Sequence, residues 1–215
     1  YKKIFIPKKL LKLFNINIDI FIRTILLTFA FLWIAYQGSL LGDDYLAVNS
    51  ILLQFIMIAS FFLDAYAFST EGIVGFSLGK KVKKSFLLLV KNSFKLSFFT
   101  SIVISFFYIL FFKDIVDIIT DIDYLRYLSY EYALWIFIIP IAASICYQFD
   151  GIFIGATQTS DMRNAMILSV LSFLTISHYF TKYYGNHGLW FSVLIFMILR
   201  SVSLKIYFSR ILKKF

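Results

Sequence analysis

Long uncharged stretches alternate with short charged segments along the chain. Uncharged or nearly uncharged runs occupy residues 24–42, 45–63, 96–112, 132–149, 164–181 and 183–199. A helix needs about 20 residues to cross the hydrocarbon core of a bilayer, and every backbone polar group in lipid must be satisfied within the protein. The runs show no sustained alternation of the kind that membrane strands have. The pattern therefore predicts an all-α integral membrane protein with a bundle of six transmembrane helices.

The charged segments set the approximate limits of these helices. We expect spans at residues 20–42, 45–79, 86–112, 128–156, 162–181 and 184–207, inside a transmembrane bundle that covers residues 15–212. A basic amphipathic lead-in over residues 1–14 precedes the bundle, and a basic tail over residues 208–215 follows it. The segment between the third and fourth spans, residues 113–126, is expected along the outer surface.

Composition and charge agree with a membrane protein. Only 15% of the 215 residues are charged, against about a quarter in typical soluble domains. An excess of lysine and arginine marks the cytoplasmic side of a membrane protein, and six spans with both ends inside fit the observed distribution. The basic residues gather at the amino end, after the second run and at the carboxyl end, and include Lys80, Lys81, Lys83, Lys84, Arg210, Lys213 and Lys214.

Two acidic residues lie inside the second apolar stretch. Asp64 and Glu71 are seven residues apart, which is close to two helical turns, so both face the same side. A carboxylate in the middle of a membrane costs about 2.5–3.5 kcal/mol and usually faces a cavity or a partner. Both acids could instead be interfacial anchors at the end of a long helix. The site interpretation is favoured for Asp64 and is open for Glu71, whereas Asp150, near a polar loop, is expected at the interface.

Other polar and helix-breaking residues have structural explanations. Gln37 and Asn49 could line a cavity, but hydrogen bonds between helices are the default interpretation. Pro140 is expected to kink its helix, and the GxxxG spacing of Gly151 and Gly155 permits close helix packing. The sequence has no phosphate loop, nucleophile elbow or zinc spacing, so we expect neither an enzyme nor a metal site. The lysine clusters suit lipid headgroups rather than nucleic acid.

Two segments carry a family resemblance. LDAYAFSTEGIVGFSLGKK (Leu63–Lys81) and FDGIFIGATQTSDMRNAMILS (Phe149–Ser169) resemble the DinF branch of the MATE multidrug and toxin extrusion transporters. The pattern G-A-T-x-x-x-x-M-R-N, from Gly155 to Asn164, is the most specific part. The resemblance runs from about Asn15 to Leu204 and is to the carboxyl-terminal six-helix lobe of the family.

The resemblance implies an antiporter of the MOP superfamily in a bacterial inner membrane. Such a transporter has two six-helix lobes and exports small organic, mostly cationic compounds, driven by inflow of H⁺ or Na⁺ and without another cofactor. The amino-terminal lobe would be the missing partner, and residues 1–14 the remnant of an inter-lobe linker. A homodimeric half-transporter, a scaffold or lipid-handling subunit, and a truncated non-functional fragment are the alternatives.

The resemblance also gives a hypothesis for the acids. Asp64 is expected to face the interior of the lobe, where polar neighbours on adjacent helices hold it. It would there either help to bind a cationic substrate or a coupling ion, or fix the second helix. Asp150 and Arg163 are expected to pair near the cytoplasmic mouth. Asp161 and Arg163 could equally serve as helix-capping and dipole residues at the start of the fifth helix, beside Asn164.

Overall fold

The computed structural model describes residues 7–213, and all secondary structure in that range is helical. The sequence forms these helices because long apolar stretches leave the backbone no other way to satisfy its hydrogen bonds in lipid. The helices are α1 (Pro7–Leu41), α2 (Asp43–Gly79), α3 (Lys83–Ile119), α4 (Asp123–Glu131), α5 (Ala133–Gly155) and α6 (Thr159–Leu212). The predicted all-α fold class is confirmed.

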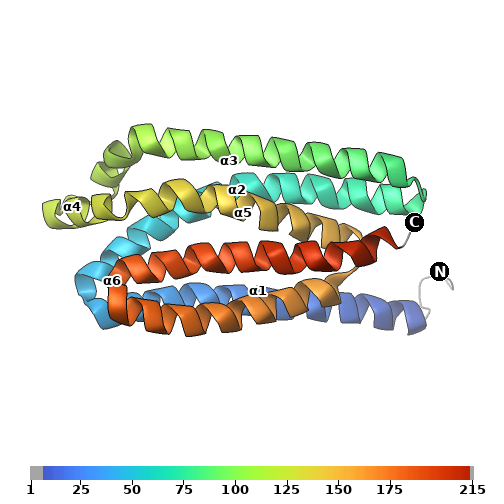
Figure 1. Ribbon diagram of the computed structural model, residues 1–215, viewed down its shortest axis with the longest axis horizontal. Coiled ribbons are helices and arrows are strands. Elements are labelled where there is room, and N and C mark those ends of the chain that lie inside the picture. The colour runs from blue at the N-terminus through green and yellow to red at the C-terminus, as the bar shows by residue number, and fades with distance from the viewer. Residues whose placement is uncertain (1–6, 214–215) are drawn as a thin grey trace.

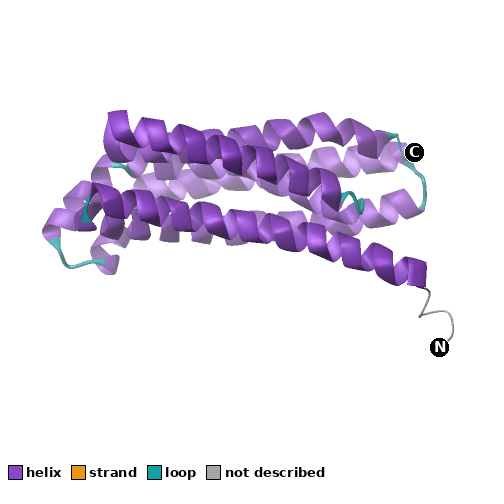
Figure 2. Ribbon diagram, turned by 90° about the horizontal axis from the view of Figure 1, so that it is seen from below, coloured by secondary structure: helices purple, strands orange, loops and turns teal. Residues whose placement is uncertain are grey.

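The long helices run side by side along one axis (Figures 1 and 2). The short helix α4 lies at one end of the bundle, and both ends of the described chain lie at the other (Figure 1). The turn between α2 and α3, with Lys80 and Lys81, is at the same end as the termini, as is the start of α3, with Lys83 and Lys84. The fold therefore separates a lysine-rich end from the end that carries α4.

Helix α6 consists of two arms that fold back on each other at Gly185 (Figure 1). Gly185 has φ 57° and ψ −141°, a conformation that residues with a Cβ rarely adopt. A Cβ at Gly188 would lie 2.1 Å from the carbonyl oxygen of Phe180, so the arms touch directly beside the turn. The loop expected around residues 182–185 is thus reduced to a break at one glycine.

Four helices are long and apolar enough to cross a membrane. They are α1 from Leu10, α2, α5 and the whole of α6. The 54 residues of α6 include two arms of about 26 residues, each about 39 Å long at 1.5 Å per residue. Helix α3 has 37 residues but is not among the four. The count of six spans stays a prediction.

The observed helix ends differ from the expected ones in three places. Residues 7–14 of the predicted lead-in continue α1 as regular helix, while residues 1–6 lie outside the described range, as do residues 214–215 of the tail. The expected span 128–156 is divided at Tyr132 into α4 and α5. Residues 113–119 of the expected surface segment extend α3.

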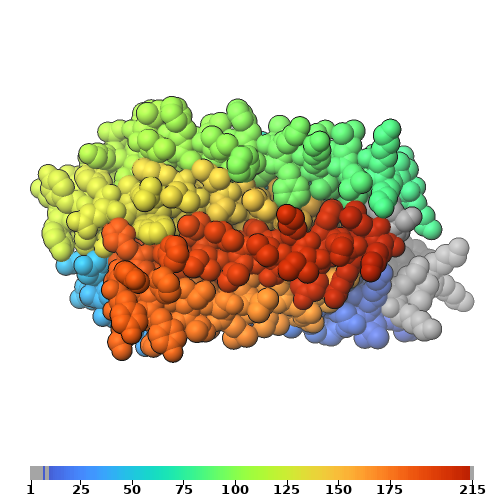
Figure 3. All heavy atoms as spheres, viewed as in Figure 1, coloured from blue at the N-terminus to red at the C-terminus, as the bar shows by residue number. Residues whose placement is uncertain are grey.

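Helix α5 lies at the centre of the bundle, and residues 146–153 of α5 are all buried. Two apolar clusters surround it, one around Phe55, Ile136 and Trp190 and the other around Phe86 and Phe153. By contrast, α1 and α3 carry rows of exposed apolar side chains, which suits contact with lipid tails. Helices α3 and α6 make up much of the face seen in Figure 3. The bundle therefore encloses α5 and presents an apolar exterior.

Candidate functional site

Two arginines meet one aspartate in the interior of the bundle. Arg23 of α1 and Arg200 of the second arm of α6 both donate from Nη2 to Oδ2 of Asp150 on α5. Arg200 is 1% exposed and Asp150 is 4% exposed. We call these three residues the Arg–Asp–Arg cluster; it joins three helices that are far apart in the sequence.

The helical repeat explains how this cluster is supported. Tyr147 lies three residues before Asp150 on α5, so its ring and the carboxylate share one face. The guanidinium of Arg200 lies 5.8 Å from the centre of the Tyr147 ring. The Tyr147 hydroxyl donates to the hydroxyl oxygen of Ser60 on α2, at 2.7 Å. Helix α2 is therefore connected to the cluster through Tyr147.

The cluster carries one positive charge in excess, since it has two guanidinium groups and one carboxylate. Asp64 of α2 is half-buried and interacts electrostatically with Arg23, Asp150 and Arg200. Adding Asp64 makes the total charge zero, because two arginines then face two aspartates. Uncompensated charge is costly in a low-dielectric interior, and a charged Asp64 would offset the excess positive charge of the cluster. The prediction that polar neighbours on adjacent helices hold Asp64 stays a prediction.

Several donors and acceptors of the cluster have no hydrogen-bond partner among residues 7–213. These atoms are Arg23 Nε, Asp150 Oδ1 and Arg200 Nη1, and all three are buried. Asp64 itself makes no ion pair within the described range. Buried polar groups are usually satisfied, so this arrangement leaves hydrogen-bonding capacity for another group.

The expected pair of Asp150 and Arg163 is wrong. Arg163 Nη1 lies 2.5 Å from Oδ1 of Asp19 on α1, and Thr159 donates to Oδ2 of Asp19 at 3.0 Å. Asp150 is buried inside the bundle instead of lying at the interface, whereas Arg163 faces α1 from the first turns of α6. The Nε and Nη2 groups of Arg163 also donate to Oδ1 of Asn164, which is exposed.

Asp161 does not cap α6 through its side chain. The residue at the N-cap position is Gln158, whose own side chain makes no capping hydrogen bond but donates to Asp161 at 3.0 Å. Asp161 is buried and pairs with Arg210 near the end of the second arm. The carboxylate therefore fastens the two arms of α6 together at the end opposite Gly185.

The sequence analysis did not select Asp19, Arg23 or Arg200, for which the sequence pattern gives only weak signals. Asp19 and Arg23 are one turn apart on α1, beside an otherwise apolar stretch, and Arg200 is the one charged residue between positions 183 and 204. Each is an isolated charge in a hydrophobic context, which is the signal that could have marked it. Their partners could not be read from the sequence, because the packing order of the helices was unknown.

Asn49 has the role of joining helices. Its Nδ2 donates to Oδ1 of Asn186, and its Oδ1 accepts a hydrogen bond from Trp190 Nε1, both at 2.8 Å. Gly38 of α1 provides the room, since a Cβ there would lie 2.8 Å from Asn49 Nδ2. Gln37, next to Gly38, is also buried, at 4% exposure. These residues lie where α1, α2 and α6 pack together and are not part of the Arg–Asp–Arg cluster.

The GxxxG residues bring α5 into backbone contact with α2. A Cβ at Gly151 would lie 2.2 Å from the carbonyl oxygen of Ala67, and one at Gly155 would lie 2.3 Å from that of Glu71. The side chain of Glu71 is partly exposed and makes no ion pair within residues 7–213. Pro140 is buried within α5, which stays helical from Ala133 to Gly155.

A second polar group joins α2, α3 and α5. Gln148 Oε1 accepts hydrogen bonds from Thr70 at 2.9 Å and from Ser93 at 2.8 Å. The three side chains are buried, and Gln148 precedes Phe149 and Asp150 on the fully buried part of α5. This group contains no charged residue, which suits it to holding helices together more than to attracting an ion.

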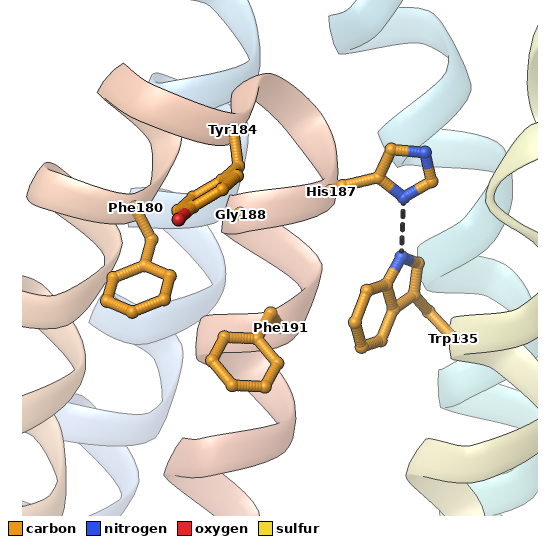
Figure 4. A pocket seen from close by; sticks show the side chains of 6 residues that line it. All are labelled: Trp135, Phe180, Tyr184, His187, Gly188 and Phe191. Atoms are coloured by element: carbon orange, nitrogen blue, oxygen red, sulfur yellow. Dashed lines mark hydrogen bonds between the residues drawn. The ribbon is translucent and has the colours of Figure 1, made fainter.

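A small pocket lies beside the turn of α6 (Figure 4). Its volume is about 240 Å³, and its lining is mainly aromatic: Trp135, Phe180, Tyr184, His187, Gly188 and Phe191. Trp135 Nε1 donates to His187 Nδ1 at 3.1 Å, which fixes the imidazole at the rim (Figure 4). The pocket is at the end of the bundle that carries α4, away from the Arg–Asp–Arg cluster.

The fold and its interior define the class of protein. Apolar helices that are long enough to cross a bilayer surround buried charged residues, which is the arrangement of a multi-pass membrane protein. Comparison with known proteins then gives the family: the chain belongs to the MatE family, whose model matches residues 20–181.

A curated relative supports the DinF resemblance. The chain is 31% identical over 193 residues to the DNA damage-inducible protein F of Escherichia coli (strain K12). The match covers 90% of this chain and 42% of the relative, so the chain spans less than half the length of that protein.

Solved structures share the fold at low sequence identity. The crystal structure of MATE in the bent conformation matches with a TM-score of 0.84 and 17% identity, over 91% of this chain and 44% of that one. The outward-facing conformation of a multidrug resistance MATE family transporter of the MOP superfamily matches with a TM-score of 0.83 and 16% identity, over 92% and 44% of the two chains. Helices α1–α6 thus have the arrangement of part of a MATE transporter.

Proposed function

We propose that the chain is the carboxyl-terminal half of an efflux antiporter that is driven by H⁺ or Na⁺ and exports small organic compounds. The observation that carries this proposal is the Arg–Asp–Arg cluster with Asp64, because charged groups buried among membrane helices typically mark a transport pathway. The family membership and the coverage of the relatives, 42% and 44%, support a partner lobe. The proposed location is the bacterial inner membrane, with the lysine-rich end in the cytoplasm.

Asp64, beside the Arg–Asp–Arg cluster, is the residue that a coupling ion would reach. It is half-buried, whereas Asp150 and Arg200 are almost fully buried. Binding of a proton or a sodium ion to Asp64 would cancel its charge and leave the Arg–Asp–Arg cluster with one positive charge in excess. Such a change in electrostatic energy between two states is what can bias a conformational equilibrium in a transporter.

The polarity of the exported compounds is a separate question. The family resemblance implies cationic substrates, but the charges of the Arg–Asp–Arg cluster and Asp64 sum to zero in this half. Selection of cations would therefore depend on the amino-terminal half. We accordingly propose small organic compounds as the substrate class of the whole transporter.

A transport assay on the complete reading frame tests the proposal. The protein is reconstituted with fluorescent dyes of different charge, and extrusion is followed under a proton gradient and, separately, under a sodium gradient. We expect extrusion under one of the two gradients. Absence of extrusion under both, for a protein that is correctly folded, would contradict the proposed function.

Neutralising Asp64 gives the first specific prediction. Asp64→Asn should lower dye extrusion about tenfold, the effect of about 1.4 kcal/mol, without lowering the amount of protein in the membrane. The reason is that the variant can no longer switch the charge opposite Arg23 and Arg200. Asp44→Asn is the matched control, since Asp44 is exposed in the first turn of the same helix. Unchanged extrusion by Asp64→Asn would remove Asp64 from the pathway.

A further inference from the structure

A groove lies between α5 and the second arm of α6, and we call it the α5–α6 groove. Its volume is about 240 Å³, and its walls include Ala142, Ile145, Phe149, Ile198, Val202 and Lys205. Residues 142–149 and 198–205 each extend about 10 Å along their helices. Both segments run toward the lysine-rich end of the bundle, so Phe149 and Lys205 lie at that end of the groove. Figure 3 shows part of α5 at the surface between α3 and α6.

The walls of the groove are apolar and accessible. Ile145, Ile198 and Val202 are 38%, 45% and 49% exposed. Ser201, which also lines the groove, is buried and donates its hydroxyl hydrogen to the backbone carbonyl oxygen of Met197 at 2.9 Å. The groove therefore offers a hydrocarbon surface and leaves no serine hydroxyl to be satisfied, which suits a lipid acyl chain.

Lys205 brings a charge to one end of this apolar surface. It is exposed and makes no ion pair within residues 7–213, and none of the residues that line the groove is acidic. A lysine can lay its methylene groups along an apolar surface while its ammonium group reaches the polar headgroups. The groove thus combines an apolar channel with a cation at its lysine-rich end.

Helix α3 adds positive charge at the same end. The ring of Phe149 contacts Phe94 of α3 and Phe208 of α6, with centroid distances of 5.1 and 5.9 Å, so three helices meet there. Lys91 and Lys95 lie within one turn of Phe94, are exposed, and make no ion pair in the described part of the chain. The lysine-rich end of the groove therefore has an excess of positive charge.

We propose that the α5–α6 groove is a binding site for an acidic glycerophospholipid. One acyl chain lies against Ile145, Ile198 and Val202, and the phosphate interacts with the ammonium group of Lys205. An acidic headgroup is favoured because basic residues at the membrane surface attract anionic lipids, whereas a zwitterionic headgroup brings its own cation toward the lysines. With the lysine-rich end in the cytoplasm, the lipid belongs to the inner leaflet.

The bound lipid would join two helices that carry the buried ion pair. It contacts α5, which holds Asp150, and the arm of α6 that holds Arg200. A ligand that binds only the folded protein stabilises it, so the acidic lipid should raise the unfolding temperature. The inference goes beyond the proposed function, because it depends on neither the exported compound nor the coupling ion.

Lipid binding to the purified full-length transporter tests this inference. The protein in detergent is titrated with dioleoyl phosphatidylglycerol and, separately, with dioleoyl phosphatidylcholine, and native mass spectrometry counts the bound lipids. We expect phosphatidylglycerol to bind at least about fivefold more tightly, the contribution of one lysine near the membrane surface. Equal binding of the two lipids, which would follow if the amino-terminal half covered the groove, would overturn the inference.

Lys205→Gln tests the contact with the phosphate. It should weaken binding of phosphatidylglycerol about fivefold and leave binding of phosphatidylcholine unchanged. Lys182→Gln is the matched control, since Lys182 is also exposed on α6 but lies in the first arm, near Gly185. This control should change neither affinity. An unchanged affinity of Lys205→Gln for phosphatidylglycerol would place the phosphate elsewhere and contradict the inference.

Val202→Trp tests the apolar part of the site, because the larger side chain fills the groove. It should weaken binding of phosphatidylglycerol about tenfold, in protein whose elution profile and thermal unfolding show it to be folded. Ile206→Trp is the control, since Ile206 is 68% exposed one turn further along α6 and does not line the groove. Undiminished binding by folded Val202→Trp would show that the acyl chain does not occupy the groove.

A soluble phosphate separates a lipid site from a simple anion site. Glycerol 3-phosphate carries a phosphate without acyl chains, so it should not displace phosphatidylglycerol when the two are present at equal concentration. Displacement at equal concentration would mean that the lysines bind any phosphate and that the assignment to a lipid is wrong.

Discussion

At the scale of single residues, Asp150 connects more of the molecule than any sequence pattern indicated. Its carboxylate accepts hydrogen bonds from Arg23, 127 residues earlier in the chain, and from Arg200, 50 residues later. One oxygen of one side chain thus holds α1 and the second arm of α6 against α5. Without it, two buried guanidinium groups would face each other.

Asp150→Asn should therefore destabilise the protein strongly. The change removes the negative charge between two buried arginines, and loss of one partner from a buried ion pair costs about 3–5 kcal/mol. Asp117→Asn is a suitable control, because the side chain of Asp117 is 46% exposed and pairs with Arg126 at the surface, where an ion pair contributes about 0–1 kcal/mol. Thermal unfolding in detergent measures both variants. Equal melting temperatures would show that the buried cluster contributes no stability.

The sequence drew attention to both carboxylates, because a carboxylate in an apolar run is costly enough to need an explanation. Only Asp64 was interpreted as an interior residue, whereas Asp150 was expected at the interface. Arg23 and Arg200 were not recognised, and Asp150 was assigned the wrong partner. The reason is physical: sequence periodicity gives the face of a helix on which a side chain lies, but not which neighbouring helix meets that face.

At the scale of helices, the contact between α2 and α5 depends on two glycines. Gly151 and Gly155 are one turn apart and lie against the backbone of Ala67 and Glu71. The close contact was predictable from the GxxxG spacing, although its partner helix was not. The approach also brings Asp64 of α2 to the same side of the bundle as Asp150, the residue just before Gly151.

Gly151→Ala should separate α2 from α5. The added methyl group would lie 2.2 Å from the carbonyl oxygen of Ala67, and overpacking of this kind costs about 1–3 kcal/mol. Gly72→Ala on α2 is the matched control, since a Cβ there meets nothing within 4 Å; it should be neutral or stabilise the helix by about 0.5–1 kcal/mol. Denaturation of the two variants in the same detergent compares them. A stable Gly151→Ala protein would mean that the helices tolerate a wider spacing.

At the scale of the whole molecule, the two ends of the bundle carry side chains of opposite charge. Lys80, Lys81, Lys83 and Lys84 lie at the end that holds both termini of the described chain, while Asp117, Asp121 and Asp123 lie at the end with α4. The sequence predicted this polarity correctly, because the positions of the charges between apolar runs already imply it. The sequence pattern did not predict that the two arms of α6 are joined at the single residue Gly185, because the polar residues around Lys182 suggested a longer loop.

This polarity predicts which positions a reagent can reach from outside the cell. In a protein without Cys146, which is buried, a cysteine at Lys84 should not react with a membrane-impermeant maleimide, whereas one at Tyr124 should. Both residues are exposed on opposite ends of the bundle, and the lysine-rich end should face the cytoplasm. Both cysteines should react after the cells are opened. Labelling of Lys84→Cys in intact cells would reverse the proposed orientation.

The single-glycine turn of α6 also decides where the protein can be tagged. An epitope inserted at Gly185 would force apart two arms whose backbones touch at Phe180 and Gly188. The corner between α3 and α4 is different, because residues 120–122 are non-helical and Asp121 and Ile122 are exposed. Detection and affinity handles therefore belong at that corner, where an inserted peptide would meet mainly the contacts that Arg126 makes at the surface with Asp117, Thr120 and Asp121.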